Sequence, residues 1–279
     1  MNAFSSPAFN EPSLFLPAFP WPASDGHKYD RGHVALLSGP RGQTGAIRLA
    51  ARAALRIGAG LATVVSTADA LAEHAAHLDA VMLHAVAGDG EIVTWLENDP
   101  RIAAVALGPG FGRERARALL PELIALGRAM TIDADALRAL PTDVVFGADQ
   151  PVILTPHAGE FASAFPGISL DDHAAAAGEA AQRVNAVVLL KGSRTVVAAP
   201  DGRRARNAPA TPFLATAGSG DVLTGIASGL LAQGMPAFEA ACCAVWIHAE
   251  AGASVGPGLI SEDLPDALPR ILRRLFEAP

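Results

Sequence analysis

The segment Leu214–Gly234, LATAGSGDVLTGIASGLLAQG, decides how the chain is interpreted, because it joins a glycine-rich loop to an apolar helical pattern. Gly225 and Gly229 lie four residues apart on one side of that pattern, where a neighbouring backbone can approach closely. The apolar positions share another face at helical spacing: Val222, Leu223, Ile226 and Leu230. We predict a helix that begins near Gly220 and ends near Gly234, just before a proline.

The start of this helix combines unpaired backbone donors with a carboxylate. The first N–H groups of a helix have no internal partner and carry partial positive charge. Gly218 and Gly220 allow the backbone to curl so that these groups point at one anion. Asp221 beside such a cradle indicates phosphoryl transfer, in which the carboxylate takes a proton from the attacking hydroxyl. The alternative is that Asp221 only caps the helix.

Outside this segment, short apolar runs alternate with helical patterns. Continuous apolar strands separated by helices are typical of a mostly parallel sheet covered on both faces, with ligands at the carboxyl ends of the strands. We therefore predict an α/β three-layer sandwich. The expected strands are 34–39, 61–66, 80–86, 102–108, 130–133, 152–157 and 186–192.

The two ends of the chain differ from this alternation. Residues 194–208 are predicted to form a hairpin with Asp201-Gly202 as a two-residue turn, followed by helices from Val222 onward. Residues 1–24 form a Pro/Phe-rich arm that has five prolines and lacks the basic stretch of a signal peptide. Residues 25–279 show no linker or repeat, so we predict a single domain.

Composition excludes several classes of partner. The net charge is −7 and no long basic stretch is present, so we do not expect nucleic-acid binding. No uninterrupted apolar run reaches the ~18 residues of a membrane span. Cys242 and Cys243 are adjacent and form no disulfide framework, which predicts a cytoplasmic protein.

The loop AGSGD (217–221) resembles the GxGD signature of the ribokinase-like superfamily, and further motifs narrow the resemblance. Over residues 27–255, the chain resembles the ADP-dependent NAD(P)H-hydrate dehydratase family. The motifs appear in the order GPRGQTGAIRLAARAALRIGAGLATV (39–64), LGPGFGR (107–113), DADAL (133–137), LTPHAGEFA (154–162), LLKGSRTVV (189–197) and NAPATPFLATAGSGDVLTGIASGLLAQG (207–234).

The resemblance implies a lyase that repairs nicotinamide nucleotides hydrated at C6 of the ring, NADHX and NADPHX. ADP phosphorylates the C6 hydroxyl, AMP remains, and expulsion of phosphate restores the dihydropyridine. It also implies Mg²⁺ as a cofactor and a homotetramer. Two alternatives share the fold: an ATP-dependent small-molecule kinase and a nucleotide sensor without turnover. Only about 25 residues precede the resemblance, so the epimerase domain that many relatives carry is not expected here.

Carried over residue by residue, the resemblance assigns three sets of positions. The catalytic set is Asp221 with Gly218 and Gly220. The nucleotide-binding set is Lys191, Gly192, Ser193, Arg194, Thr195, Asn207 and Gly220. The substrate-binding set is Gly45, Ala46, Gly108, Gly110, Gly112, His157, Glu160 and Asp221.

Some assignments keep a second interpretation. Asp133 ends an expected strand and is a candidate metal ligand, whereas Asp135 is equally well explained as a helix cap. Glu160 is expected either to orient His157 or to help hold magnesium. The chain departs from the family's usual GGTGD and PHPGE motifs at three positions, where it has Ala217, Ser219 and Ala158. We expect no change of reaction from these departures.

Overall fold

The computed structural model describes residues 6–277. These residues form a ten-stranded sheet in the order β1-β10-β9-β8-β7-β6-β5-β2-β3-β4. Its strands are β1 (Ala8–Phe9), β2 (His33–Leu37), β3 (Leu61–Thr67), β4 (Met82–Val86), β5 (Ile102–Leu107), β6 (Ala129–Ile132), β7 (Val152–Leu154), β8 (Val187–Leu190), β9 (Val196–Ala198) and β10 (Arg204–Arg206). Strand β9 runs antiparallel to both of its neighbours, and the other described pairs are parallel. The predicted mostly parallel sheet is confirmed.

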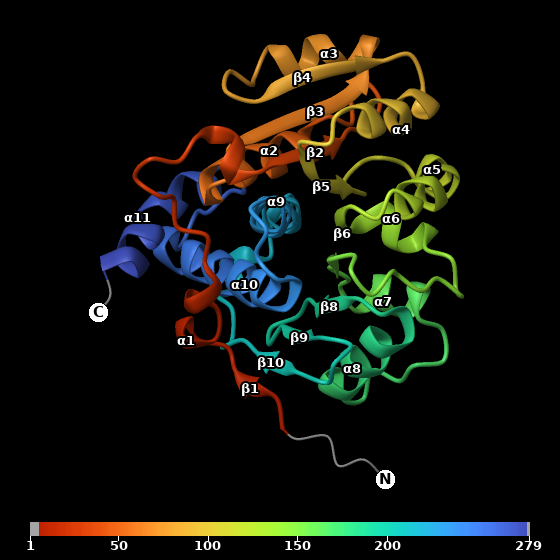
Figure 1. The fold of residues 1–279 in the computed structure, drawn as a ribbon. Helices are drawn as coiled ribbons and strands as arrows, with labels where there is room; N and C mark the ends of the chain where they lie inside the picture. The colour runs from red at the N-terminus through yellow and green to blue at the C-terminus, as the bar shows by residue number, and fades with distance from the viewer. Residues whose placement is uncertain (1–5, 278–279) are drawn as a thin grey trace.

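Helices cover both faces of the sheet (Figure 1). One face carries α2 (Gly45–Ile57), α9 (Ser219–Ala232), α10 (Ala237–Val255) and α11 (Asp263–Glu277). The other carries α4 (Asp89–Asn98), α5 (Arg113–Ala125), α6 (Ala134–Ala139), α7 (Ala158–Ala164) and α8 (His173–Val184). The shorter elements are α1 (Pro12–Phe15), η1 (Leu16–Ala18), η2 (Lys28–Arg31), α3 (Ala68–Ala75) and η3 (Pro212–Leu214).

Strand β2 contributes side chains to two hydrophobic cores, one on each face of the sheet. Alternate side chains of a strand point to opposite faces of its sheet. Val34 and Leu36 therefore belong to the core beneath α9, while Ala35 and Leu37 belong to the core beneath α5. This strand reads as a continuous apolar run because both of its faces are buried. The predicted three-layer arrangement follows from that burial.

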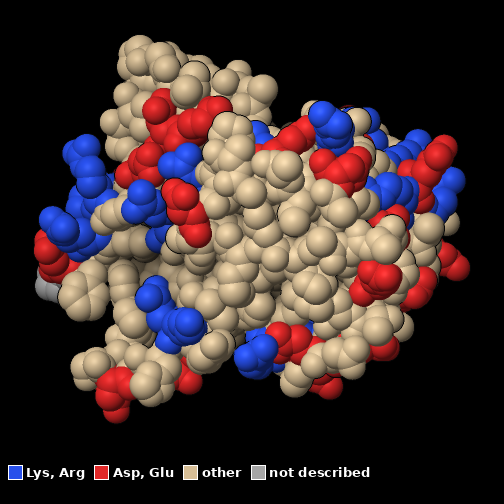
Figure 2. Space-filling model, turned by 90° about the horizontal axis from the view of Figure 1, so that it is seen from above, with Lys and Arg blue, Asp and Glu red and all other residues tan. Residues whose placement is uncertain are grey.

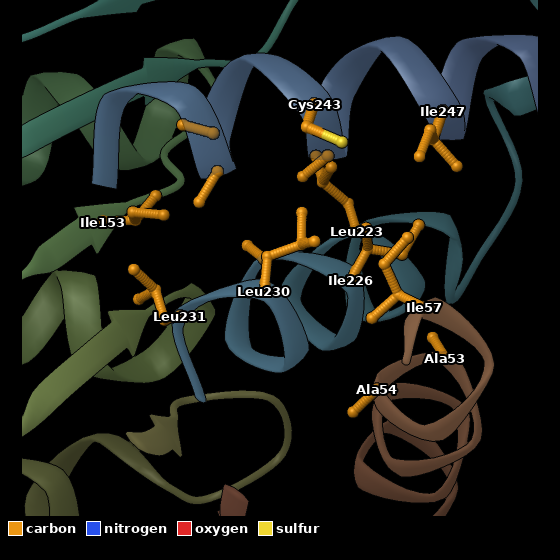
Figure 3. Close-up of a cluster of buried hydrophobic side chains, with 14 of the residues drawn as sticks. Ala53, Ala54, Ile57, Ile153, Leu223, Ile226, Leu230, Leu231, Cys243 and Ile247 are labelled. Atoms are coloured by element: carbon orange, nitrogen blue, oxygen red, sulfur yellow. The ribbon is translucent and has the colours of Figure 1, made fainter. Parts of the chain in front are cut away.

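Helix α9 lies at the centre of the molecule, between α2 and α10 (Figure 3). It begins at Ser219, one residue before the expected start, and nearly all of it from Val222 onward is buried. A Cβ built on Gly225 would lie 2.1 Å from the carbonyl oxygen of Ala50 in α2, and one on Gly229 would lie 2.5 Å from Cγ2 of Ile57. The predicted close backbone approach at these glycines is confirmed.

Two local predictions need correction. The expected buried strand at 80–86 is an edge strand. Among the described strands β4 is the last of the sheet, next to β3, and most of its side chains are exposed or half-buried. The hairpin between β9 and β10 turns through three residues, since Ala199 N donates to Arg203 O at 2.9 Å. Gly202 occupies the left-handed position at φ 94°, as three-residue hairpins require.

The described part of the N-terminal arm docks on the domain. Strand β1 pairs with β10 through Ala8↔Ala205, and Phe15 is fully buried in the core with α10. The proposed division at residue 24 stays a prediction. On the face in Figure 2, basic and acidic side chains are interspersed. Within residues 6–277, no helix has the length and hydropathy needed to cross a bilayer.

Candidate active site

A cavity of about 720 Å³ opens at the carboxyl end of β8, against the start of α9. It is bounded by η3 and α10, which contribute apolar side chains such as Leu214 and Val245. The predicted nucleotide residues among its lining are Lys191, Gly192, Ser193, Thr195, Asn207 and Gly220. The described lining does not include Arg194, which is exposed. His157, predicted to bind substrate, also lines the cavity.

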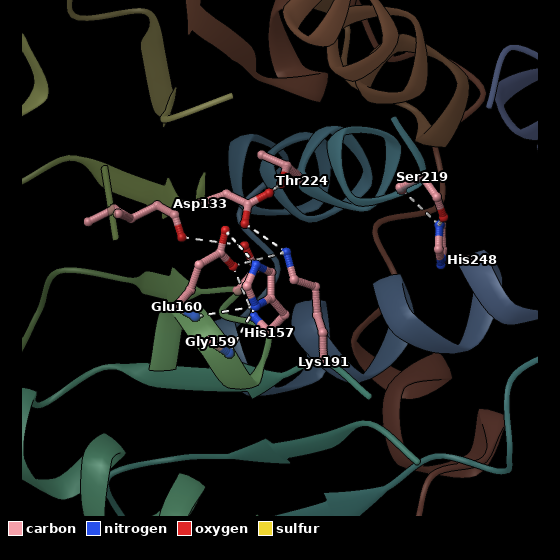
Figure 4. Close-up of polar contacts among 10 residues, drawn as sticks. Asp133, His157, Gly159, Glu160, Lys191, Ser219, Thr224 and His248 are labelled. Atoms are coloured by element: carbon pink, nitrogen blue, oxygen red, sulfur yellow. Dashed lines mark hydrogen bonds and ion pairs between the residues drawn. The ribbon is translucent and has the colours of Figure 1, made fainter. Parts of the chain in front are cut away.

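Lys191 directly follows β8 and forms a parallel bridge with His157, which places both residues at the same edge of the sheet. Its Nζ lies 2.9 Å from Oδ1 of Asp133 and 3.8 Å from Oε2 of Glu160 (Figure 4). Burial acts to lower the pKa of Lys191, but the facing carboxylates outweigh it, and the pKa lies above its usual value. Lys191 is therefore a fixed cation among acidic groups.

Asp133 follows β6 and is buried, with both carboxylate oxygens bonded. Oδ1 accepts from Lys191, and Oδ2 accepts from the Thr224 hydroxyl at 2.6 Å. Within residues 6–277, no group of three or more His, Cys, Asp or Glu side chains is arranged to hold a metal ion. The predicted metal contact of Asp133 stays a prediction, and its geometry here is that of an anchor for Lys191.

His157 and Glu160 form a reciprocal capping box at the start of α7. Nδ1 of His157 accepts from the backbone N–H groups of Gly159 and Glu160, at 3.0 and 3.2 Å. Oε2 of Glu160 accepts from the His157 N–H at 3.0 Å, and its Oε1 lies 3.3 Å from Nε2 of the ring. Of the two expected roles of Glu160, the structure contains the contact that orients His157.

The AGSGD loop is held by its carbonyl groups. Ser261 Oγ donates to the carbonyl of Ala217 at 2.6 Å, and Nε2 of His248 donates to the carbonyl of Ser219 at 2.9 Å. Burial lowers the pKa of His248 to about 4, so its ring is neutral at neutral pH. In a trans peptide the N–H points opposite the preceding C=O. The N–H groups of Gly218 and Gly220 therefore point away from these anchors.

Three N–H groups of the loop remain available to an anion. Gly218 is the N-cap residue and has φ 87°, which allows the sharp turn into α9. No described residue accepts a hydrogen bond from the N–H of Gly218, Gly220 or Asp221, whereas Ser219 N donates to Thr216 O at 3.4 Å. A Cβ on Gly220 would lie 3.5 Å from Nζ of Lys191, so these donors adjoin the cation.

Asp221 is at the third position of α9, and its side chain makes no capping bond within the described chain. Burial raises the pKa of Asp221 to about 7, with the Asp133 carboxylate acting in the same direction and Lys191 opposing both. A partly buried carboxyl whose pKa lies near neutrality, in the helix turn that carries the free N–H groups and under the electrostatic influence of Lys191, can exchange a proton with a bound hydroxyl. The capping alternative does not describe this side chain.

The remaining substrate positions lie along the same edge of the sheet. A Cβ on Gly108 would lie 1.8 Å from Asp133 O, and one on Gly110 would lie 3.9 Å from Cβ of Ala46. The N–H of Gly112 donates to Oδ2 of Asp135 at 3.0 Å, so Asp135 braces this loop in addition to opening α6. Gly45 begins α2 beside a separate surface depression with Arg48 and Glu73.

Three residues that contact the site were not predicted from the sequence: Thr224, His248, and Asn10, whose side chain donates to the cavity residue Asn207. Thr224 lies one helical turn after Asp221, and that i+3 spacing is a signal that could have identified it. His248 sits in an Ala-rich helix and Asn10 in the arm, and neither position carries a local motif. Their roles depend on contacts with residues far away in sequence.

Known proteins share this architecture. The sequence profile of a family described as NAD(P)H-hydrate dehydratase matches residues 34–273. A bifunctional NAD(P)H-hydrate repair enzyme of Moorella thermoacetica is 38% identical over 91% of this chain, but this chain spans only 52% of that protein. The chain spans about half the length of several such bifunctional relatives.

Two further relatives are similar over nearly their full length. An ADP-dependent (S)-NAD(P)H-hydrate dehydratase of Xanthomonas campestris is 36% identical, covering 93% of this chain and 94% of that protein. An ADP/ATP-dependent NAD(P)H-hydrate dehydratase of Bacillus subtilis, co-crystallized with ATP/Mg²⁺, superposes with a TM-score of 0.86 at 27% identity, covering 97% and 99% of the two chains. The ribokinase-like fold is thus confirmed, and the chain belongs to the NAD(P)H-hydrate dehydratase family.

Proposed function

We propose that the protein repairs hydrated NADH and NADPH by ADP-dependent dehydration, releasing AMP and phosphate. The observation that carries this proposal is the position of Asp221 in the first turn of α9, which also carries the free loop N–H groups, with the Lys191 ammonium acting on its pKa. Phosphoryl transfer to a hydroxyl needs this combination of a proton acceptor, an anion cradle and a positive charge.

In this mechanism Asp221 accepts the proton of the C6 hydroxyl as the hydroxyl oxygen bonds to the terminal phosphorus of ADP. The bond from that phosphorus to the bridging oxygen breaks and leaves AMP. Lys191 and the N–H groups of Gly218 and Gly220 stabilise charge on the transferred group. The electron pair on the ring nitrogen then expels phosphate from C6 and leaves an iminium ion. Loss of a proton from C5 to the departing phosphate forms the C5–C6 double bond and restores the reduced nicotinamide.

The proposal assigns the cavity to ADP and the adjoining glycine-rich edge to the hydrated dinucleotide. The nucleotide residues are Lys191, Gly192, Ser193, Arg194, Thr195, Asn207 and Gly220. The dinucleotide residues are Gly45, Ala46, Gly108, Gly110, Gly112, His157, Glu160 and Asp221. The contiguity of Gly110 with Ala46 and of Gly108 with Asp133 supports this division.

Three finer features belong to the proposal. Mg²⁺ would neutralise charge on the ADP phosphates, with Asp133 as its candidate ligand. In this structure both carboxylate oxygens of Asp133 are bonded to protein groups, Lys191 and Thr224. A homotetramer is proposed from the family resemblance, and a cytoplasmic location from the two buried free cysteines, Cys242 and Cys243.

The test combines the purified protein with acid-generated hydrated NADH and either ADP or ATP. Return of the absorbance of reduced nicotinamide with ADP supports the proposal. Return with ATP alone revises the donor, while a phosphorylated product without return supports the small-molecule kinase. Nucleotide binding without turnover supports a sensor.

Asp221→Asn is the matched variant for this test, since it keeps the shape of the side chain and removes the base. We expect turnover to fall at least ~100-fold with nucleotide binding retained. A near-normal rate would reject the role of Asp221.

A further inference from the structure

Asn10 of the N-terminal arm makes contact with a residue of the cavity. It follows β1, is 1% exposed, and its backbone N–H donates to Arg206 O at 2.9 Å. Its side-chain Nδ2 donates to Oδ1 of Asn207 at 2.9 Å and to the carbonyl of Cys242 at 2.8 Å. The arm therefore holds a lining residue of the cavity through a buried carboxamide.

The chemistry of these groups determines which way both carboxamides face. A backbone carbonyl can only accept, so the atom of Asn10 beside Cys242 must be the NH₂ group. That group has one further hydrogen, which can bond only to an acceptor on Asn207. Oδ1 of Asn207 therefore points at Asn10. The opposite orientation of Asn10 would place two carbonyl oxygens against each other in a buried position.

The other end of Asn207 is a donor that has no acceptor among residues 6–277. Asn207 lines the cavity and is 5% exposed. No described residue accepts a hydrogen bond from its Nδ2. A fully buried Nδ2 would then be a buried donor without a partner, and Nδ2 of Asn207 is not such an atom. Solvent therefore reaches Nδ2, and the cavity is the space that Asn207 adjoins.

We infer that Asn10 is a positioning residue for nucleotide binding, which makes the arm part of the nucleotide site. It sets Asn207 so that an N–H donor, and not a carbonyl oxygen, meets the nucleotide. The group that it recognises is a hydrogen-bond acceptor, either a ribose hydroxyl oxygen or a ring nitrogen of the base. This inference rests on the proposed binding of ADP in the cavity.

Asn10→Asp tests the relay with nearly unchanged shape. In this buried position a protonated carboxyl donates its one hydrogen to Cys242 O, so the same hydroxyl oxygen, which replaces Nδ2 beside Asn207, can only accept there. Asn207 must then turn its NH₂ group toward residue 10 and present its oxygen to the cavity. We expect the Kd of ADP, measured by calorimetry, and its KM to rise about tenfold, with kcat changed less than twofold.

A second variant keeps the test decisive if Asn10→Asp folds poorly. Asn207→Asp still accepts from Asn10 and presents only oxygen to the cavity, and it should also weaken ADP binding. In a double-mutant cycle, Asn10→Asp should have little effect on ADP affinity once Asn207 is Ala. Additive effects, or unchanged ADP affinity in both Asp variants, would overturn the inference.

The matched control is Phe19→Leu, which loosens the packing of the arm beside Trp21 without reaching Asn207. It should lower Tm and leave the Kd of ADP unchanged. If Phe19→Leu weakened ADP binding as much as Asn10→Asp does, the effect of Asn10 would come from its contribution to stability alone. Comparison with 2′-deoxy-ADP and 3′-deoxy-ADP distinguishes the acceptors. If the penalty of Asn10→Asp disappears with one analogue, a ribose hydroxyl is the acceptor, and if it persists with both, the base is.

These readouts separate the inference from the proposed function. Wild-type protein that binds ADP but restores no NADH contradicts the dehydration and leaves the relay testable by calorimetry. Wild-type protein that restores NADH, with variants that bind ADP normally, contradicts the relay alone. Absence of ADP binding by the wild type overturns both.

Discussion

Nζ of Lys191 lies 2.9 Å from Oδ1 of Asp133, although 58 residues separate them in the chain. The same ammonium adjoins Gly220 and lies 3.8 Å from the carboxylate of Glu160. One cation thus stands where the ends of β6 and β8 meet the start of α9. Its charge lowers the pKa of Asp221, whereas burial raises that pKa.

Replacement of Lys191 by Met should weaken ADP binding and shift the pH profile of kcat/KM to higher pH. The variant removes the ammonium that lowers the pKa of Asp221, while burial, Asp133 and Glu160 continue to raise it. Steady-state kinetics between pH 5 and 9 measure both effects.

Lys28→Met is the matched control, because Lys28 is the only other lysine of the chain and is exposed. A profile that stays in place for Lys191→Met would contradict the coupling between Lys191 and Asp221.

Activity of the wild type should fall as pH decreases through about 7, the pKa to which burial raises Asp221. Only the ionised carboxylate accepts a proton, so kcat/KM should decrease about tenfold per pH unit on the acidic side. A profile that is flat between pH 5 and 8 would show that Asp221 is not the titrating base.

Asp221→Asn should stabilise the fold at pH 8 and have little effect on stability at pH 4. The folded pKa is about 7 and the unfolded value is 3.8, so ionisation opposes folding increasingly as pH rises between them. At pH 4, close to the unfolded value, the carboxyl is protonated in the folded state and largely so in the unfolded state, so its ionisation contributes little. Tm measured at the two pH values tests the sign, and a larger gain at pH 4 would be inconsistent with a raised pKa.

Gly225→Ala should destabilise the protein, because its Cβ would lie 2.1 Å from Ala50 O and would push α9 away from α2. Overpacking of this kind costs about 1–3 kcal/mol of unfolding free energy. Gly90→Ala is the helical control: it meets nothing within 4 Å and should stabilise by about 0.5–1 kcal/mol. Urea unfolding compares them, and equal effects would remove the packing argument.

Thr224→Val should reduce the free energy of unfolding by about 1.5–3 kcal/mol, because the buried Asp133 carboxylate loses a donor at 2.6 Å. The two side chains are nearly isosteric, so packing is preserved. Thr94→Val on the exposed side of α4 should change stability little. If both variants unfold at the same urea concentration, the Thr224 bond is not stabilising.

Local patterns in the sequence were sufficient to predict the parallel sheet, the central helix α9 and the glycine-rich loop before it. A strand that is buried on both faces, such as β2, has a continuous apolar sequence. The first N–H groups of a helix lack internal partners wherever the helix lies in the fold. The approach of α2 to Gly225 was also predictable, because small residues four apart on one helix face leave room for a backbone.

Other features follow no local pattern. Nothing in residues 80–86 distinguishes a central strand from the edge strand β4, since that depends on which strands pair beyond it. The hairpin after β9 turns through three residues because the register of its strands, and not the Asp201-Gly202 pair alone, sets the turn.

The sequence by itself determined the α/β layering, the glycine-rich start of α9 and the strand ends at which Asp133 and Lys191 lie. Only the tertiary structure decided that Thr224 bonds to Asp133 from 91 residues away and that Asn10 holds Asn207 across 197 residues. Sequence periodicity reports which face of an element is buried. Which ends of distant elements meet depends on strand order and helix docking, and these are properties of the whole fold.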